Sequence, residues 1–390
     1  MDEKAKAPKR VKKPNIVVRL LALCTTGALV LGALMVVVYR DQLNLDAIRR
    51  RISYRNMQTS DTGEAAPFTH AGGSKLDLAY LEDGVVTASA AGAHYYGLDG
   101  EHLAERVLTL ENPVLEASRT TGVVYDAGGQ SLFAFRNSQE YFSLTLSGSA
   151  DLLSARPNDS GWLAVTAQQS GFKGAVTVYN NRGSEVIQIS LSSTFAIDAA
   201  ISPDCRTAAV ITIGQENGTF FSRLLLYPIN QTEPSAQIDL GSIAVLDLDY
   251  EDDLIWVLGE DRLLMVDPHD SSIQSYTFSP SYLKGCSLGG DGFALLLTGR
   301  YRSGGATQAI VVHGGEQSAR TVDLTGQILD CAAAGSYCAL LSGSHLTIYD
   351  QELTLYSLLN DAQAARQLDL APNGSALLAN DQQTWLYIPK

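Results

Sequence analysis

Three aspartates occupy the same place in three similar apolar segments. Asp198, Asp330 and Asp369 lie in Ala-Ile-Asp-Ala-Ala-Ile, Ile-Leu-Asp-Cys-Ala-Ala and Gln-Leu-Asp-Leu-Ala, and Asp247 in Ala-Val-Leu-Asp is a fourth. Carboxylates that recur at one position of a repeat can hydrogen-bond the local backbone in every copy. If they surround a shared axis instead, their oxygens can ligate a hard cation. We expect the backbone role and keep the cation site as the alternative.

Cys331 and Cys338 are the second candidate pair. Six residues separate them, so a hairpin centred between Ala334 and Gly335 would place the two thiols directly opposite each other. That position suits a cross-strand disulfide, and two small buried thiols fit an inner strand equally well. The chain has five cysteines, one of them Cys24 in the N-terminal apolar run. This is too few for a disulfide framework.

Other residue patterns predict no catalytic or metal centre. The acidic run 247–253 lacks the glycine and distal glutamate of an EF-hand, so we expect a solvated turn between the first two strands of a repeat. The six histidines show no His-x-x-x-His spacing. No Gly-x-Ser-x-Gly elbow, Walker loop or dinucleotide fingerprint occurs. We therefore predict no catalytic residue, no metal site and no cofactor.

The candidate residues belong to a repeat of about forty residues. Between Ala196 and Leu240 the chain forms four short apolar or alternating runs, with a Ser-Pro-Asp turn after the first. The third run of each unit recurs at intervals of 37 to 48 residues, and the fourth run stretches and shrinks with it. The third runs end near Leu98, Phe135, Tyr179, Tyr227, Val266, Val312, Tyr349 and Tyr387.

A period of this length with four strands per unit is typical of a β-propeller blade. The chain has eight third strands and seven fourth strands, so the last unit lacks its outer strand. Pro67-Phe68-Thr69-His70, just before the first unit, can supply it and thereby remove an open sheet edge. We predict an all-β, eight-bladed propeller over residues 66–390, with seven blades as the alternative.

The N-terminal part has the pattern of a membrane anchor. A basic leader over residues 1–19 precedes twenty uncharged residues from Leu20 to Tyr39, which as a helix would span roughly 30 Å. Residues 40–65 then contain a predicted amphipathic helix over Leu43–Tyr54 and the start of a Ser/Thr/Gly-rich tether over Gln58–Lys75. The positive-inside rule favours a cytoplasmic leader and an extracytoplasmic propeller, and the opposite orientation is the alternative.

The charge is divided between these parts. Residues 1–55 hold twelve basic and four acidic residues, whereas the remainder holds sixteen basic and thirty-eight acidic ones. A body this acidic repels phosphate backbones, so we predict no nucleic-acid partner.

Two turns carry a resemblance to known propellers. Ser202-Pro203-Asp204-Cys205-Arg206 before Ala208-Ala209-Val210 resembles the Ser-Pro-Asp-Gly turn of WD40-like and TolB-like propellers, and residues 371–375 form a weaker copy. The repeats lack the Gly-His and Trp-Asp pair of typical WD40 proteins and the Trp pattern of quinoprotein dehydrogenases. The whole layout resembles a family of clostridial single-pass membrane proteins with a quinoprotein-like or WD40-like propeller of unknown function. The resemblance implies fold and location and supplies no active-site residues.

The sequence thus favours a membrane-anchored propeller that binds a protein, peptide or glycan outside the cytoplasm. A quinoprotein-like or glycan-active propeller enzyme is the alternative, as is the same scaffold facing the cytoplasm. The enzyme would need titratable side chains that converge on the centre of the ring from the innermost strands.

Overall fold

The computed structural model describes residues 21, 23–27, 29–31, 45–55, 57–73, 75–148, 150–251, 253–315, 319–362 and 364–390. They form two compact units, Met1–Ser53 and Tyr54–Lys390. The basic leader and residues 20, 22, 28 and 32–39 of the predicted anchor lie outside the described residues. Within the described part, no helix has the length and apolar character needed to cross a bilayer.

The first unit contains the predicted amphipathic helix. This helix, α2, covers Leu45–Ser53. The described residues of the first unit between 21 and 31 are helical as well. Asp46 lies in the first turn of α2 and Arg50 and Arg51 in the last, as the helix dipole favours. Arg49 Nη1 also donates to Asp46 Oδ1 in an ion pair at 3.4 Å.

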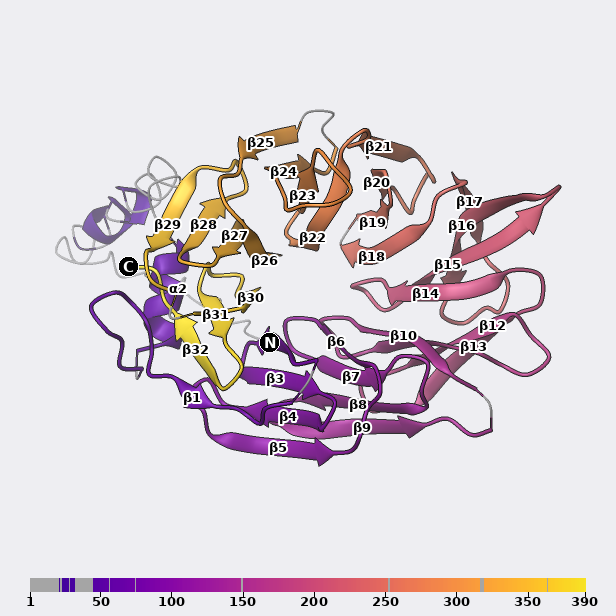
Figure 1. Cartoon of the computed structure of the whole chain (residues 1–390), viewed down its shortest axis with the longest axis horizontal. Helices are drawn as coiled ribbons and strands as arrows, with labels where there is room; N and C mark the ends of the chain where they lie inside the picture. Colours follow the sequence, from indigo (N-terminus) through magenta and orange to yellow (C-terminus); the bar gives the residue numbers. More distant parts are fainter. Residues whose placement is uncertain are drawn as a thin grey trace, which may run out of the picture. The chain divides into compact units, whose positions relative to one another are not determined.

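The second unit is an eight-bladed β-propeller, as predicted (Figure 1). Each blade is a four-stranded antiparallel sheet whose first strand lies toward the middle of the ring. Blades 1 to 4 consist of β2 Asp77–Leu81, β3 Gly84–Ser89, β4 Gly92–Tyr96 and β5 His102–Val107; β6 Pro113–Ala117, β7 Gly122–Asp126, β8 Ser131–Arg136 and β9 Gln139–Thr145; β10 Leu152–Pro157, β11 Leu163–Ala167, β12 Gly174–Tyr179 and β13 Glu185–Leu191; and β14 Phe195–Ile201, β15 Thr207–Glu216, β16 Thr219–Pro228 and β17 Ala236–Gly241.

Blades 5 to 8 repeat this order, and the last one takes its outer strand from the N-terminal side of the ring. They consist of β18 Val245–Glu251, β19 Leu254–Gly259, β20 Arg262–Val266 and β21 Ile273–Thr277; β22 Tyr282–Gly290, β23 Phe293–Gly299, β24 Gln308–His313 and β25 Ala319–Asp323; β26 Ile328–Ala334, β27 Tyr337–Ser342, β28 Leu346–Asp350 and β29 Leu355–Leu359; and β30 Gln367–Leu370, β31 Ala376–Ala379 and β32 Gln383–Tyr387 with β1 Phe68–Thr69.

The closing strand is the one predicted from the strand count. Phe68 pairs with Thr384 and Thr69 with Gln383. The segment predicted as a tether packs along blade 8 over residues 57–70. The Ala65 amide donates to the Leu386 carbonyl at 2.8 Å. The segment is therefore held by the open edge of β32, although its composition is rich in Ser, Thr and Gly.

The core lies between neighbouring blades. The second strand of a blade is covered on both faces, so it is an unbroken apolar run: every residue of β3, β23 and β27 is buried. The outer strand β13 instead alternates between exposed and buried residues. Trp256 and Trp385 are fully buried in two of these layers.

Candidate functional site at the centre of the propeller

A β-bulge interrupts the first strand of each blade from 3 to 7. The extra residue is Leu153, Ile197, Leu246, Lys284 or Leu329. A bulge twists the strand and redirects the side chains that follow it. Asp198, Asp247 and Asp330 come directly after their bulges.

The four predicted aspartates all hold backbone amides. Each accepts a hydrogen bond at Oδ1 from the amide of the next residue, at 2.8–2.9 Å. Asp77 in blade 1 makes the same bond to Leu78, and sequence reasoning missed it. Asp330 and Asp369 also reach the following blade: Asp330 Oδ2 accepts from the Leu368 amide at 2.8 Å, and Asp369 Oδ2 from the Tyr80 amide at 2.6 Å.

Among the residues that the structure describes, Asp198 and Asp247 do not reach the next blade's backbone in this way, and each forms an ion pair with an arginine. Arg156 on β10 donates through Nε to Asp198 at 2.9 Å and through Nη2 to Asp247 at 2.6 Å. Its Nη1 lies 3.4 Å from Glu116 Oε2. One guanidinium thus joins carboxylates from blades 2, 4 and 5, an arrangement suited to its planar fork of donors.

A cavity of about 250 Å³ lies beside this cluster. Asp198 is the only one of the four predicted aspartates that lines it. Its lining comprises Glu116, Tyr125, Leu153, Ser154, Arg156, Ile197, Asp198, Val245 and Leu246. Three of these, Leu153, Ile197 and Leu246, are bulge residues, so the bulges form most of the aliphatic part of the wall together with Val245.

Burial and mutual repulsion raise the pKa values of several carboxyl groups near the centre. Burial raises the pKa of Glu116 to about 7 although Arg156 acts in the opposite direction. The pKa of Asp249 rises to about 7 for the same reason, with further repulsion from Glu251 and Asp247. Burial raises the pKa of Asp330 and of Asp369 to about 6. Burial would lower the pKa of Arg156, but its three carboxylates outweigh that effect and raise it.

This geometry fits neither the predicted alternative of a cation site nor an acyl-transfer site built on a serine and a histidine. Arg156 occupies the space between the carboxylates that a cation would need, and Asp330 and Asp369 are directed to backbone amides. No histidine is among the described residues that line the cavity, and Ser154 Oγ has no hydrogen-bond partner among the described residues. Acyl transfer requires a nucleophile in contact with a base.

The acidic run 247–253 is mainly a strand and the expected solvated turn is wrong. Asp247, Asp249 and Glu251 lie on β18, and Leu248 between them is buried. Alternation along the strand directs the acidic side chains away from the core layer that holds Leu248. The prediction of a turn rested on the number of acidic residues and overlooked their alternation with Leu248 and Tyr250.

The cysteine pairing register also differs from the predicted one. Ala334 pairs with Tyr337, so Cys331 faces Leu340 and Cys338 faces Ala333, and both thiols are free. The hairpin turns at Gly335 and Ser336, one residue later than expected. Gly335 adopts φ +57°, and a Cβ there would lie 2.3 Å from the Pro372 carbonyl oxygen of blade 8. That close approach requires glycine at the first central position of the turn.

Exposed aromatic residues gather on one face of the propeller. First strands begin on this face, and the loops between second and third strands lie on it, because the sheets are antiparallel meanders. We call it the bulge face, since the bulge residues lie near these strand starts. All the exposed phenylalanines and tyrosines among the described residues lie here, together with exposed bulge leucines: Phe172, Phe195, Phe220, Leu246, Tyr282, Tyr301 and Leu329.

Residues 53–265, more than half of the chain, match a family of unknown function, DUF5711. The chain belongs to this family. The match extends through blades 1 to 4 and nearly to the end of the third strand of blade 5. No curated protein matches the chain.

Solved structures share the fold. The computationally designed Ika8 protein matches with a TM-score of 0.59 and 14% identity, over 82% of this chain and 99% of that one. The C-terminal WD40 domain of Sif2 matches with a TM-score of 0.57 and 13% identity, over 82% and 100%. AztD from Citrobacter koseri matches with a TM-score of 0.52 and 10% identity, over 74% and 86%. At these identities the likeness establishes a propeller fold alone.

Proposed function

We propose that this protein is a membrane-anchored binding module that holds a protein partner on the bulge face of its propeller, outside the cytoplasm. The observation that carries the proposal is the gathering of Phe172, Phe195, Phe220, Tyr282 and Tyr301 on that face. Tyr301 is 74% exposed. Aromatic side chains are enriched at the centres of protein interfaces, and an apolar surface collected on one face marks an interaction site.

Charged residues lie among the aromatic side chains of the same face. The propeller is acidic as a whole, yet Lys173, Lys284, Arg300 and Arg302 lie in or beside the loops that carry the aromatic residues. Lys173 Nζ lies 4.4 Å from the centre of the Phe195 ring. Glu216, Glu260 and Asp261 lie at the same set of loops, so a partner surface with apolar residues and charges of both signs would complement this face. WD40-type propellers such as that of Sif2 share the scaffold, which supports the proposal by analogy of fold.

The membrane anchor is part of this proposal. Its support is the uncharged run from Leu20 to Tyr39, the basic leader before it and the helical state of its described residues. The positive-inside rule favours a propeller outside the cytoplasm. Protease treatment of intact cells tests this part: we expect cleavage of the propeller before lysis, whereas protection until lysis would place it in the cytoplasm.

A binding role accounts for the centre of the ring better than an enzymatic one. The carboxylates that converge there are ion-paired with Arg156 or bonded to backbone amides, so they are committed to joining blades. A quinoprotein-like or glycan-active enzyme would need such groups free to act on a substrate, whereas Glu116 and Asp198, which line the cavity, are ion-paired with Arg156.

The experiment that tests the proposal compares two faces of one protein. Full-length chains with Tyr301→Ser and Phe220→Ser are expected to lose partner capture after cross-linking in cells. The matched control carries Ile273→Ser and Leu355→Ser. Both replace exposed apolar residues at the start of an outer strand, on the face opposite the bulge face. Equal capture by both chains, or capture of cell-wall glycan alone by the unaltered chain, would contradict it.

A further inference from the structure

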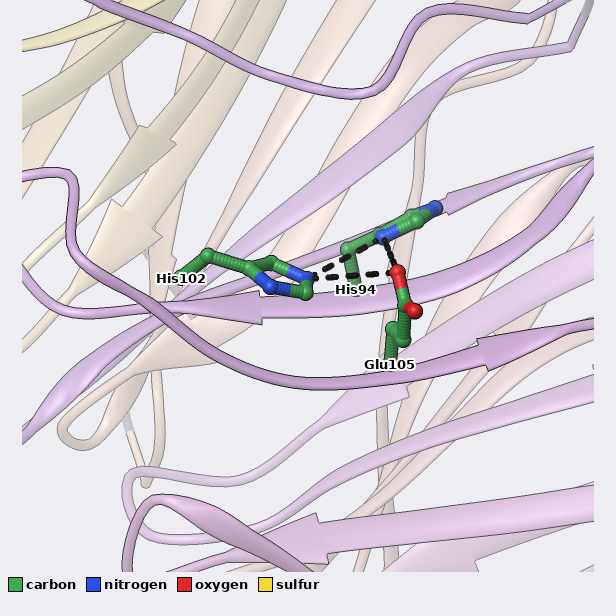
Figure 2. A group of neighbouring side chains, drawn as sticks. All are labelled: His94, His102 and Glu105. Carbon is green, nitrogen blue, oxygen red and sulfur yellow. Dashed lines mark hydrogen bonds and ion pairs between the residues drawn. The ribbon is translucent and has the colours of Figure 1, made fainter.

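Three side chains on the outer strands of blade 1 bring their donor atoms together (Figure 2). His94 Nδ1 on β4 lies 3.4 Å from His102 Nε2 and 3.5 Å from Glu105 Oε2, both on β5. His102 Nε2 lies 3.6 Å from the same Glu105 oxygen. Figure 2 shows these three atoms facing one another, with the second ring nitrogen of His94 on the far side.

The backbone explains why these residues meet although their spacing follows no metal-binding motif. His94 pairs directly with Glu105 across the ladder, and Tyr95 with Ala104. A bulge at Leu103 then brings His102, not Leu103, opposite Tyr96. Alternation places Tyr96 on the same face as His94, so the bulge brings His102 onto that face too. Without it, His102 would point to the opposite side of the sheet.

We propose that His94, His102 and Glu105 bind one divalent transition metal ion, with Zn²⁺ the best match to two imidazoles and a carboxylate. Zinc bonds to such ligands at about 2.0–2.2 Å, so tetrahedral ligand atoms lie roughly 3.3–3.5 Å apart. The three observed separations fall within 0.3 Å of that range. A single ion can therefore bind all three atoms with only small side-chain movements.

The surroundings suit a metal site with one open position. His94 is buried, whereas the side chains of His102 and Glu105 are 44% and 52% exposed. An ion can enter from solvent, and water can complete its coordination. At the paired position on β3, Thr87 is buried, and its hydroxyl has no hydrogen-bond partner in the described part of the chain.

The site lies where the ring closes. The Tyr96 ring is stacked with that of His94 at 6.1 Å and tilted to that of His102 at 5.3 Å between ring centres. Its other contacts are to the closing segment: the Phe68 ring centre lies 5.4 Å away, and the Ala71 amide donates to the Tyr96 hydroxyl at 2.8 Å. An ion that joins β4 to β5 would stiffen the surface against which β1 rests. We therefore assign it a structural role at the closure.

Zinc binding by the full-length, untagged chain tests the site. After chelator treatment and dialysis, addition of Zn²⁺ alone is expected to restore one ion per chain by mass spectrometry and to raise Tm. His102→Ala and Glu105→Gln replace exposed ligands, so the variants are expected to fold, to bind zinc at least tenfold more weakly and to show no rise in Tm. His269→Ala is the matched control, since exposed His269 lies 3.6 Å from a single carboxylate, Asp253; its zinc binding should be unchanged.

Replacement by Co²⁺ adds an independent readout. Visible absorption typical of four-coordinate cobalt is expected in the unaltered chain and absent in His102→Ala. The proposal is overturned if the unaltered chain retains no zinc, if His102→Ala binds it equally well, or if the loss is the same in His269→Ala. The last two results would mean binding elsewhere on the acidic surface.

Discussion

The carboxylate of Asp369 accepts a hydrogen bond from the amide of Tyr80 at 2.6 Å, although 289 residues separate the two along the chain. This bond joins the innermost strand of the last blade to that of the first. The same carboxylate holds the Leu370 amide at 2.8 Å. The ring is therefore closed both at its outer rim, by β1 on β32, and at its centre, by Asp369.

The Asp369 contact predicts the effect of its removal. Asp369→Ala leaves the amides of Tyr80 and Leu370 without their acceptor, and hydrogen bonds to charged groups contribute about 1.5–3 kcal/mol each. Because the cost of burying the carboxylate offsets part of this contribution, we expect the free energy of unfolding in urea to fall by about 2–4 kcal/mol. Asp239→Ala is the control, because exposed Asp239 accepts one hydrogen bond in the described part of the chain, from the Gly241 amide of its own outer strand. A loss no larger than that of the control would refute the closing role.

Arg156 should be indispensable to the centre of the ring. Arg156→Ala leaves Glu116, Asp198 and Asp247 facing one another without their shared cation. Removing one partner of a buried ion pair costs about 3–5 kcal/mol, and we expect the lower end because the carboxylates retain some exposure. Thermal and urea unfolding measure the loss. Arg320→Ala, which breaks an exposed pair with Glu352, is the control and should change stability by less than about 1 kcal/mol.

The central carboxyl groups predict that stability falls as the pH rises from about 4 to about 7. In the unfolded chain these groups titrate near pH 4. In the folded protein the pKa is about 7 for Glu116 and Asp249 and about 6 for Asp330 and Asp369. Between these values the folded state binds more protons, so each rise in pH favours unfolding.

Urea unfolding at pH 5.0 and pH 7.5 measures this dependence. The unaltered chain should be more stable at pH 5.0, and Asp249→Asn should show a smaller difference between the two conditions. Equal stability at both values, or greater stability at pH 7.5, would contradict the assignment.

The free thiols predict a simple alkylation pattern. Burial raises the pKa of the Cys286 and Cys338 thiols to about 12 and raises that of Cys331 as well. Within the propeller we therefore expect Cys205 to react first with iodoacetamide in the folded protein, and all four thiols to react in urea. Intact mass in urea should be the same with and without a reductant. Two fewer alkylations without reductant would show a disulfide and contradict the observed register.

The outer closure predicts a sharp limit to N-terminal truncation. A chain that begins at Tyr54 retains the Ala65 amide bond to Leu386 and the pairing of β1 with β32. A chain that begins at Gly72 lacks both and exposes an unpaired edge. At about 1 kcal/mol for each lost backbone hydrogen bond, we expect a loss of about 3 kcal/mol and a tendency to aggregate. Equal stability of the two chains would show that the closing strand is dispensable.

The fold could be predicted from the sequence because the blades repeat. Eight third strands, seven fourth strands and Phe68-Thr69 ahead of them are sufficient to place the closing strand. The recurring aspartates were visible for the same reason. Arg156 could not be predicted in this way. In blade 3 the position of the recurring aspartate, directly after the bulge, is occupied by Ser154, and Arg156 lies two residues further along the strand. A single residue that departs from a repeat carries no periodic signal.

Local backbone geometry accounts for the other differences. The hairpin is centred one residue later than predicted, between Gly335 and Ser336, so the two cysteines are not paired. Composition alone does not distinguish this centre from the one between Ala334 and Gly335. The bulge at Leu103 brought His102 to the face of His94 and Glu105, although strict alternation would separate them. The exposed aromatic residues are far apart in sequence, and only the closed ring places them on one face.

The most direct test of the proposed function is site-specific photo-cross-linking in intact cells from the two faces of the full-length protein. A photoreactive residue at Tyr301 or Tyr282 on the bulge face is expected to cross-link to one discrete protein partner. The same residue at Ile273 or Leu355 should give none, although these positions are similarly exposed. Absence of a cross-link from the bulge face, or the same product from both sets of positions, would contradict the account.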